Sequence, residues 1–256
     1  MLNNIQIGPL TIHMYGLMVG IGFAAAYMIS CKQAEKKGLN SDIIWGILIC
    51  AILGILIGSR LLFYAVSIPQ IIKDPSILWN FKNGYVVYGG LIFGVLFGYI
   101  YCMKKKVSFF KYLDLAMPSV SVAQGFGRIG CFFAGCCYGR ETDSWFHIIY
   151  THSDFAPNNT ALIPTQLLSS AGNFAIAAVL FWYSSKSKTD GSTGALYMIL
   201  YSTGRFIIEI FRNDNRGFIG SLSTSQLISI AVFILGILFM TVLKKRDTKI
   251  KTLSDF

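Results

Sequence analysis

Charged residues are scarce in this chain: they make up 13% of its 256 residues, about half of the share that a soluble domain carries. Hydrophobic residues make up 54%, and apolar segments about 20 residues long, enough to span a bilayer core, recur along the whole length. The composition therefore excludes a soluble globular protein. It predicts an all-α integral membrane protein without a soluble domain or a low-complexity tract.

Basic residues are also missing from the start of the chain, MLNNIQIGPL. A cleaved signal peptide begins with a positively charged region, so the first apolar segment is expected to remain in the mature protein. The apolar segments predict seven transmembrane helices, over residues 8–30, 43–66, 84–103, 112–137, 165–184, 192–211 and 222–243. Residues 1–243 are expected to form one membrane domain, followed by a short basic cytoplasmic tail over 244–256.

The net charge of +10 is explained by where the basic residues lie. Fourteen lysines and arginines fall in the tail and in the connections between spans 1 and 2, 3 and 4, and 5 and 6, against five on the opposite side. Because basic loops stay in the cytoplasm, the N-terminus is expected outside and the C-terminus in the cytoplasm. The charge thus reports membrane topology, and no nucleic-acid partner is expected.

Three further arginines lie within predicted spans or at their edges: Arg60, Arg128 and Arg205. An intramembrane charge costs roughly 2.5–3.5 kcal/mol on insertion scales, and the helical rise places all three in the outer half of the membrane. Polar residues at the starts of spans 1, 3 and 7 reach the same depth; they are His13, Tyr15, Tyr85, Tyr88 and residues 223–226. A single arginine could instead extend to the headgroups, and this alternative stays open for Arg60. Together the residues predict a cationic cavity in the outer half of the bilayer, where phospholipid headgroups are the available anions.

The segment GRFIIEIFR, residues 204–212, adds a carboxylate to this cavity. Arg205, Glu209 and Arg212 are spaced by four and three residues and therefore share one helix face. Glu209 can pair with either arginine, as a purely structural ion pair or to orient the arginines toward an anionic ligand. A guanidinium suits phosphate because its fork matches two phosphate oxygens.

The segment GRIGCFFAGCCYG, residues 127–139, holds three of the six cysteines and has several interpretations. A dinucleotide loop would need a βαβ unit around GFGRIG, which seven spans do not provide. Cys131, Cys136 and Cys137 could form a disulfide, or bind a metal if His147 or His152 supplied the fourth ligand of a closed zinc site; our expectation is that no metal is bound. Glycines allow close helix approach, but packing does not explain Arg128.

Short motifs along nearly the whole chain carry a resemblance. They are IHMYG (12–16), GSR (58–60), GGLIFG (89–94), LDLAMPSV (113–120), GRIG (127–130), YG (138–139), PTQL (164–167), GRFIIEIFR (204–212) and LSTSQLISI (222–230). Each motif is weak alone, but the ordered set on seven spans is specific. The chain resembles the prolipoprotein diacylglyceryl transferase family.

The resemblance implies a seven-helix membrane fold with a central cavity open to the outer leaflet. It also implies a transferase of the bacterial cell membrane that moves the diacylglyceryl group of phosphatidylglycerol onto the lipobox cysteine thiol of prolipoproteins. The products are a thioether and glycerol phosphate, and no cofactor takes part. Arg128 and Arg205 are implied to bind the phosphate and stabilise its developing charge, and Tyr88 is the third candidate catalytic residue. The implied substrate-binding residues are Tyr15, Arg60, Gly89, Gly90, Gly130, Gly139, Glu209 and Arg212.

Several polar positions depart from the family pattern. Tyr88 stands in place of a histidine, and a tyrosine, with a pKa near 10, is a poorer base at neutral pH. The general base therefore stays open among Tyr88, a bound water and His13. Other replacements are Cys131, Ala134 and Cys136 for two asparagines and a glutamate, and Leu168 and Ser169 where tyrosine and glutamate often occur.

These departures leave two other functions open. One is a related lipid-headgroup transferase with a different acceptor, in which Cys136 or Cys137 is a nucleophile of the enzyme. The other is a membrane protein that binds lipid without catalysis. Glycine-rich spans 3 and 4 show no inverted repeat, which argues against a transporter.

Overall fold

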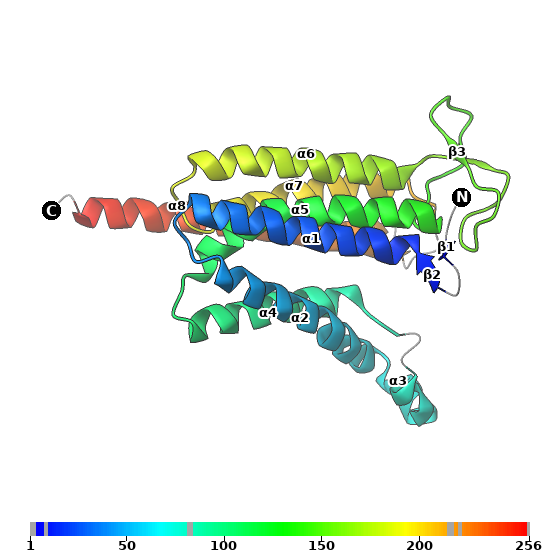
Figure 1. Ribbon diagram of the computed structural model, residues 1–256, viewed down its shortest axis with the longest axis horizontal. Coiled ribbons are helices and arrows are strands. Elements are labelled where there is room, and N and C mark those ends of the chain that lie inside the picture. Colours follow the sequence, from blue (N-terminus) through cyan, green and yellow to red (C-terminus); the bar gives the residue numbers. More distant parts are fainter. Residues whose placement is uncertain (1–3, 8–9, 81–83, 214–217, 220–221, 255–256) are drawn as a thin grey trace. The chain divides into compact units, whose positions relative to one another are not determined.

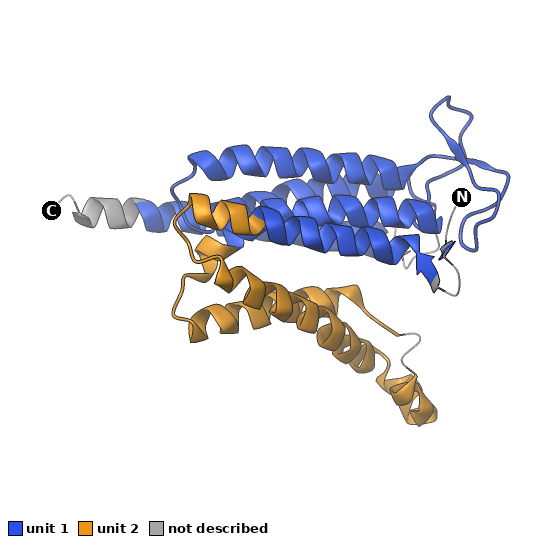
Figure 2. Cartoon of the chain, in the orientation of Figure 1, with its two compact units in different colours: residues 1–29, 113–256 blue, residues 30–112 orange. Residues whose placement is uncertain are grey.

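A computed structural model describes residues 4–7, 10–80, 84–213, 218–219 and 222–254. Its main elements are α-helices (Figure 1). They are α1 (Met14–Lys36), α2 (Asp42–Val66), α3 (Ile68–Lys73), α4 (Val87–Lys104), α5 (Phe109–Ala134), α6 (Thr165–Lys186), α7 (Ser192–Ile210) and α8 (Thr224–Ser254), with a 3₁₀ helix η1 over Pro75–Trp79. The residues group into two compact units, Met1–Ile29 with Leu113–Phe256 and Ser30–Tyr112 (Figure 2).

Within the described residues, five helices are long and apolar enough to cross a membrane: α1, α2, α4, α6 and the Thr224–Asp247 part of α8. They correspond to predicted spans 1, 2, 3, 5 and 7 and support an integral membrane protein. Spans 4 and 6 are also helices, α5 with 26 residues and α7 with 19, but they are not among the five. These two helices carry Arg128, Arg205 and Glu209, so crossing a membrane would require them to be shielded by other helices.

The first predicted span begins too early. Residues 10–13 form strand β2 (Leu10–His13), which pairs antiparallel with β1 (Asn4–Ile7) and sets His13 opposite Asn4, and α1 begins only at Met14. The reason is visible in the sequence, because both segments alternate apolar and polar residues with the period of a strand. At the other end, α8 continues to Ser254, so most of the predicted tail extends this helix.

The second unit is built on close packing of α2 against α4. A Cβ atom added to Gly54 would collide with the backbone of Gly94, and one added to Gly58 would lie 2.5 Å from the carbonyl oxygen of Gly89. Small residues allow helix backbones to approach in this way. Gly89 is therefore a packing residue in the structure, and so is Gly90, where an added Cβ would lie 3.0 Å from the Cα of Ile55. Their approach to a lipid headgroup stays a prediction.

This interface predicts unequal effects for two neighbouring glycines. Gly54→Ala is expected to lower the free energy of unfolding by about 1–3 kcal/mol, because the new methyl group meets backbone that cannot rotate away. Gly94→Ala is the matched control: its nearest neighbour would be the carbonyl oxygen of Ala51 at 3.7 Å, an ordinary contact. Thermal unfolding in detergent measures both, and equal midpoints would contradict the packing described.

In the first unit, α1, α5, α6, α7 and α8 lie side by side, with β1, β2 and β3 (Ile148–Ile149) at one end (Figure 1). The start of α7 is fixed by a carboxylate from α5. Asp114 Oδ2 accepts a hydrogen bond from the Gly191 amide at 2.7 Å, and Oδ1 accepts one from the Gly194 amide at 2.8 Å. The first amides of a helix have no partner within the helix, so buried Asp114 accepts hydrogen bonds from donors that would otherwise have no acceptor.

Asp114→Asn is expected to destabilise the first unit by about 2 kcal/mol, because the amide cannot offer two charged acceptors to these backbone donors. The exposed loop residue Asp143 supplies the control, Asp143→Asn, which removes the same charge and should leave unfolding unchanged. The thermal midpoint of each purified variant in detergent reports the difference. An Asp114→Asn midpoint equal to the control would exclude this anchoring role.

The connection from α5 to α6 forms a small packed head. Strand β3 pairs with β4 (Ala161–Leu162), and the side chains of Tyr150 and Leu162 are buried in one cluster. Burial raises the pKa of Tyr150 to about 12, so its hydroxyl stays neutral and accepts a hydrogen bond from Gln166 Nε2 at 3.1 Å. Gln166 Nε2 also donates to the Cys136 carbonyl oxygen at 2.8 Å. The start of α6 therefore holds the turn that follows α5. A third pair, β5 (Phe218–Ile219) with β6 (Leu222–Ser223), precedes α8.

Candidate active site

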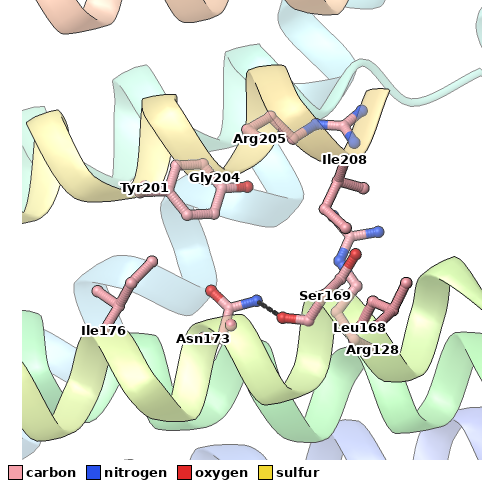
Figure 3. A pocket seen from close by; sticks show the side chains of 10 residues that line it. Arg128, Leu168, Ser169, Asn173, Ile176, Tyr201, Gly204, Arg205 and Ile208 are labelled. Carbon is pink, nitrogen blue, oxygen red and sulfur yellow. Dashed lines mark hydrogen bonds between the residues drawn. The ribbon is translucent and has the colours of Figure 1, made fainter. Parts of the chain in front are cut away.

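A cavity lies in the first unit, between helices α5, α6 and α7 (Figure 3). Two arginines face it, Arg128 from α5 and Arg205 from α7. The other lining residues are Leu168, Ser169, Gly172, Asn173 and Ile176 from α6 and Tyr201, Gly204 and Ile208 from α7. Cationic groups and apolar walls together suit an amphiphilic anion, since the guanidinium groups match a phosphate and the aliphatic side chains match hydrocarbon.

Along α7, Tyr197, Tyr201, Arg205 and Glu209 are spaced four apart, and of these Tyr201 and Arg205 line the cavity. Such spacing places all four on one helix face. The rings of Tyr197 and Tyr201 stack at a centroid distance of 5.5 Å, and the Tyr197 hydroxyl donates to Gln124 Oε1 of α5 at 2.9 Å. Sequence reasoning missed Tyr201 as a cavity residue, although its position four residues before Arg205 was the available signal.

Arg205 is held by residues from α7 and from the start of α8. Its Nη2 lies 2.9 Å from Glu209 Oε2 and donates to Ser225 Oγ at 3.1 Å. Glu209 Oε1 accepts a further hydrogen bond from the Ser223 hydroxyl at 3.0 Å. The structure thus pairs Glu209 with Arg205, one of the two pairings that the sequence left open. The carboxylate fixes the guanidinium and compensates its charge.

The α6 wall contains the two positions that depart from the family pattern after PTQL. Leu168 and Ser169 both line the cavity, and Asn173 one turn later donates from Nδ2 to the Ser169 carbonyl oxygen at 2.8 Å (Figure 3). The Asn173 side-chain oxygen is buried and has no hydrogen-bond partner among the described residues. A buried acceptor without a partner is costly, so this oxygen is a candidate contact for a ligand donor such as a glycerol hydroxyl.

Four predicted substrate-binding residues have packing or backbone contacts elsewhere in the first unit. A Cβ added to Gly130 would lie 3.2 Å from Tyr15, so these two residues bring α5 and α1 together. Gly139 donates its amide to the Ile163 carbonyl oxygen at 3.1 Å and forms an isolated bridge with Arg212. These contacts place Tyr15, Gly130, Gly139 and Arg212 in the same unit as the two cavity arginines. Substrate contact by them stays a prediction.

Arg60, Tyr88, Gly89 and Gly90 belong to the second unit. The Arg60 guanidinium is buried and donates to the carbonyl oxygens of Gly84, Ile77, Leu78 and Asn80 at 2.8–3.3 Å, while Nε donates to the Tyr64 hydroxyl. This arginine therefore organises the loop between α2 and α4. Tyr88 lies in the first turn of α4 and is 40% exposed. Roles for Arg60 in lipid binding and for Tyr88 in catalysis stay predictions.

Comparison with known proteins assigns the chain to a family. The family model described as prolipoprotein diacylglyceryl transferase matches residues 3–242. The chain belongs to the prolipoprotein diacylglyceryl transferase family. The resemblance seen in the ordered motifs is thereby confirmed, and the cavity arginines lie in two of those motifs, GRIG and GRFIIEIFR.

Several members of this family are similar to this chain over nearly their whole length. The phosphatidylglycerol--prolipoprotein diacylglyceryl transferase of Clostridium tetani is 46% identical over 228 residues, which is 89% of this chain and 92% of the relative. Enzyme 2 of that name from Clostridium perfringens is 40% identical over 95% of this chain and 96% of its own length. The Streptococcus pyogenes relative is 33% identical over 96% and 95%. The full-length coverage excludes a match confined to one apolar segment.

Proposed function

We propose that this protein transfers the diacylglyceryl group of phosphatidylglycerol to the lipobox cysteine thiol of prolipoproteins, forming a thioether and releasing glycerol phosphate. The observation that carries the proposal is the pair of arginines, Arg128 and Arg205, facing one cavity with apolar walls. Family membership supports the same reaction, because the relatives' names specify phosphatidylglycerol and prolipoprotein.

The reaction requires stabilisation of the charge on the leaving group and deprotonation of the attacking thiol. The bond between the glycerol C3 and the phosphate oxygen breaks, so negative charge grows on the departing glycerol phosphate. Donors placed at that oxygen before the reaction lower the barrier, and Arg128 and Arg205 are suited to this role. The attacking group is a thiolate, whose parent thiol has a free pKa near 8.5, so deprotonation must be assisted. Leu168, Ile176 and Ile208 can face the hydrocarbon of the diacylglyceryl group.

The membrane arrangement that fits this reaction has seven spans, with α5 and α7 crossing alongside the five apolar helices. We place the N-terminus outside, the C-terminus in the cytoplasm and the cavity open to the outer leaflet of the bacterial cell membrane. The distribution of lysines and arginines supports this orientation. In it, Arg128 and Arg205 lie at the depth of phospholipid headgroups, where both the lipid and an exported prolipoprotein are present.

The direct test is expression in bacteria depleted of their own transferase, together with a reporter lipoprotein. We expect the reporter to gain the mass of one diacylglyceryl group, and a reporter with serine at the lipobox cysteine to gain none. Purified protein supplied with phosphatidylglycerol or phosphatidylethanolamine then identifies the donor lipid. Stable, membrane-inserted protein that forms no thioether on the reporter would overturn the proposal and favour a different acceptor.

A further inference from the structure

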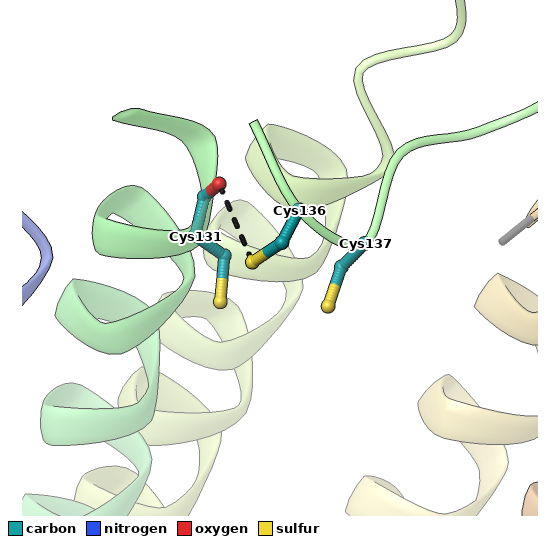
Figure 4. A group of neighbouring side chains, drawn as sticks. All are labelled: Cys131, Cys136 and Cys137. Atoms are coloured by element: carbon teal, nitrogen blue, oxygen red, sulfur yellow. Dashed lines mark hydrogen bonds between the residues drawn. The ribbon is translucent and has the colours of Figure 1, made fainter. Parts of the chain in front are cut away.

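The three clustered cysteines form a site that the proposed reaction has not yet used. Cys131 lies in the last turn of α5, and Cys136 and Cys137 follow in the next turn of the chain (Figure 4). Their sulfur atoms all lie within 4.8 Å of one another, and all three are free, partly buried thiols. Neither His147 nor His152 belongs to this group, so the cluster offers three sulfur ligands.

The backbone turn that gathers these sulfurs is unusual and well anchored. Gly135 and Cys137 both adopt positive φ, +71° and +63°. For a residue other than glycine this conformation is uncommon and costs on the order of 1–3 kcal/mol, so it persists only where the surroundings impose it. Thr165 Oγ1 donates to the Cys137 carbonyl oxygen at 2.8 Å, and Gln166 holds the Cys136 carbonyl oxygen. The start of α6 thus fixes the positions of the cysteines.

We propose that Cys131, Cys136 and Cys137 bind one zinc ion as thiolates, and that its fourth coordination position takes the thiol of the acceptor. Thiolates are the ligands that zinc and other soft cations prefer. Zinc–sulfur bonds of about 2.3 Å in tetrahedral geometry place the sulfurs roughly 3.8 Å apart, which the observed cluster allows. Three protein ligands with one open position are typical of catalytic rather than structural zinc. The family resemblance implied no metal, and this inference departs from it.

The charges around the cluster favour such a site. Three thiolates with one zinc ion carry a net charge of −1, which neighbouring cations would stabilise. Gly139, two residues after Cys137, forms an isolated bridge with Arg212, which places this arginine beside the cysteine turn. Arg128 precedes Cys131 by three residues on α5, so these two residues are about one helical turn, roughly 5 Å, apart along the helix axis.

The claim that the acceptor thiol occupies the fourth coordination position rests on the proposed function. A thiol that coordinates zinc gives up its proton, which passes to solvent. The sulfur then uses its electron pair to form the bond to the glycerol C3, while the carbon–oxygen bond breaks and glycerol phosphate leaves with that electron pair beside Arg128. The thioether product is neutral and binds zinc more weakly than a thiolate. Zinc would thereby activate the acceptor thiol in a chain that has tyrosine at position 88.

Metal binding can be measured without any transfer assay. The full-length protein, purified in detergent, reduced and stripped of metal, is titrated with Co²⁺ as a spectroscopic probe. We expect one Co²⁺ per chain, with thiolate-to-metal charge-transfer absorption that Zn²⁺ displaces. Cys131→Ser, Cys136→Ser and Cys137→Ser should each weaken binding at least tenfold, whereas Cys31→Ser and Cys50→Ser are matched controls that should not. Absence of the absorption in the folded wild type, or its survival in the triple serine variant, would overturn the site.

A second measurement needs no variant. Zn²⁺ should slow alkylation of the three clustered cysteines in the wild-type protein, with Cys31 and Cys50 as internal references for peptide mapping. Unchanged alkylation rates would also overturn the zinc site. A disulfide within the cluster would do the same if it persisted under the reducing conditions in which transfer occurs.

Experiments with an acceptor peptide distinguish a failure of the zinc proposal from a failure of the proposed function. A lipobox peptide with cysteine should change the Co²⁺ spectrum, and the serine peptide should not; equal spectra would exclude acceptor coordination. Full transfer by metal-free protein or by the serine variants would refute a zinc role and leave the proposed function standing. A bound metal in a protein that transfers nothing would refute the proposed function and leave the metal site standing.

Discussion

Arg128→Ala is expected to lower the rate of diacylglyceryl transfer by about 100- to 1000-fold, the cost of removing one charge-stabilising donor from a transition state. Arg128 faces the cavity from α5, opposite Arg205 on α7. Its guanidinium would contact the phosphate oxygen on which charge develops, so the loss should appear mainly in kcat. The measurement is thioether formation on a lipobox peptide by purified enzyme in phosphatidylglycerol-containing micelles.

Two variants sharpen this prediction. Arg128→Lys keeps the positive charge but loses the bidentate fork, so it should recover only part of the lost rate. Lys188→Ala removes an exposed positive charge in the connection between α6 and α7 and should leave the rate unchanged. Wild-type activity in a folded Arg128→Ala protein would refute the phosphate-binding role of this arginine.

Glu209→Gln is expected to lower the free energy of unfolding by about 3 kcal/mol, because breaking one side of a buried ion pair leaves the other charge uncompensated. The Glu209 side chain is only 3% exposed, and its carboxylate lies 2.9 Å from the guanidinium of Arg205. Transfer activity should fall as well, since the carboxylate fixes the orientation of Arg205 at the cavity. Thermal unfolding in detergent and the transfer assay report these two effects.

A double-mutant cycle tests whether the destabilisation arises from the ion pair. Arg205→Met with Glu209→Gln removes both charges, and this double variant should be more stable than Glu209→Gln alone because no unpaired charge remains. It should stay inactive, since the phosphate ligand is gone. Additive losses of stability in the double variant would show that the two side chains are not energetically coupled.

Hydropathy predicted the helices of this protein well. Each of the seven predicted spans overlaps a helix of the structure, and the start of α6 at Thr165 was placed correctly. A bilayer requires every backbone polar group to be paired within its own segment, so long apolar segments specify helices locally. The helix boundaries were less predictable. Because Asn4–Ile7 and Leu10–His13 pair as strands, α1 begins later than predicted, and the alternating apolar and polar residues of both segments are typical of strands.

The surroundings of individual side chains were harder to predict than the helices. The Arg60 guanidinium donates to the carbonyl oxygens of Ile77, Leu78, Asn80 and Gly84, and which acceptors a buried arginine finds depends on how the chain returns to it. Its role in lipid binding stays a prediction. Tyr201 was overlooked because one tyrosine in an apolar span is unremarkable until its helix face is known. Gly89 and Gly90 pack against α2, a contact that no spacing within α4 reveals.

The sequence by itself determined the membrane character, the helices, the family and the shared helix face of Arg205 and Glu209, because each depends on composition or on residues within one or two helical turns. Only the tertiary structure decided that Arg128 and Arg205 face one cavity, and that the sulfurs of Cys131, Cys136 and Cys137 meet. These results depend on contacts between residues far apart in the chain. The cysteine turn, for example, is held by Thr165 and Gln166, about 30 residues later.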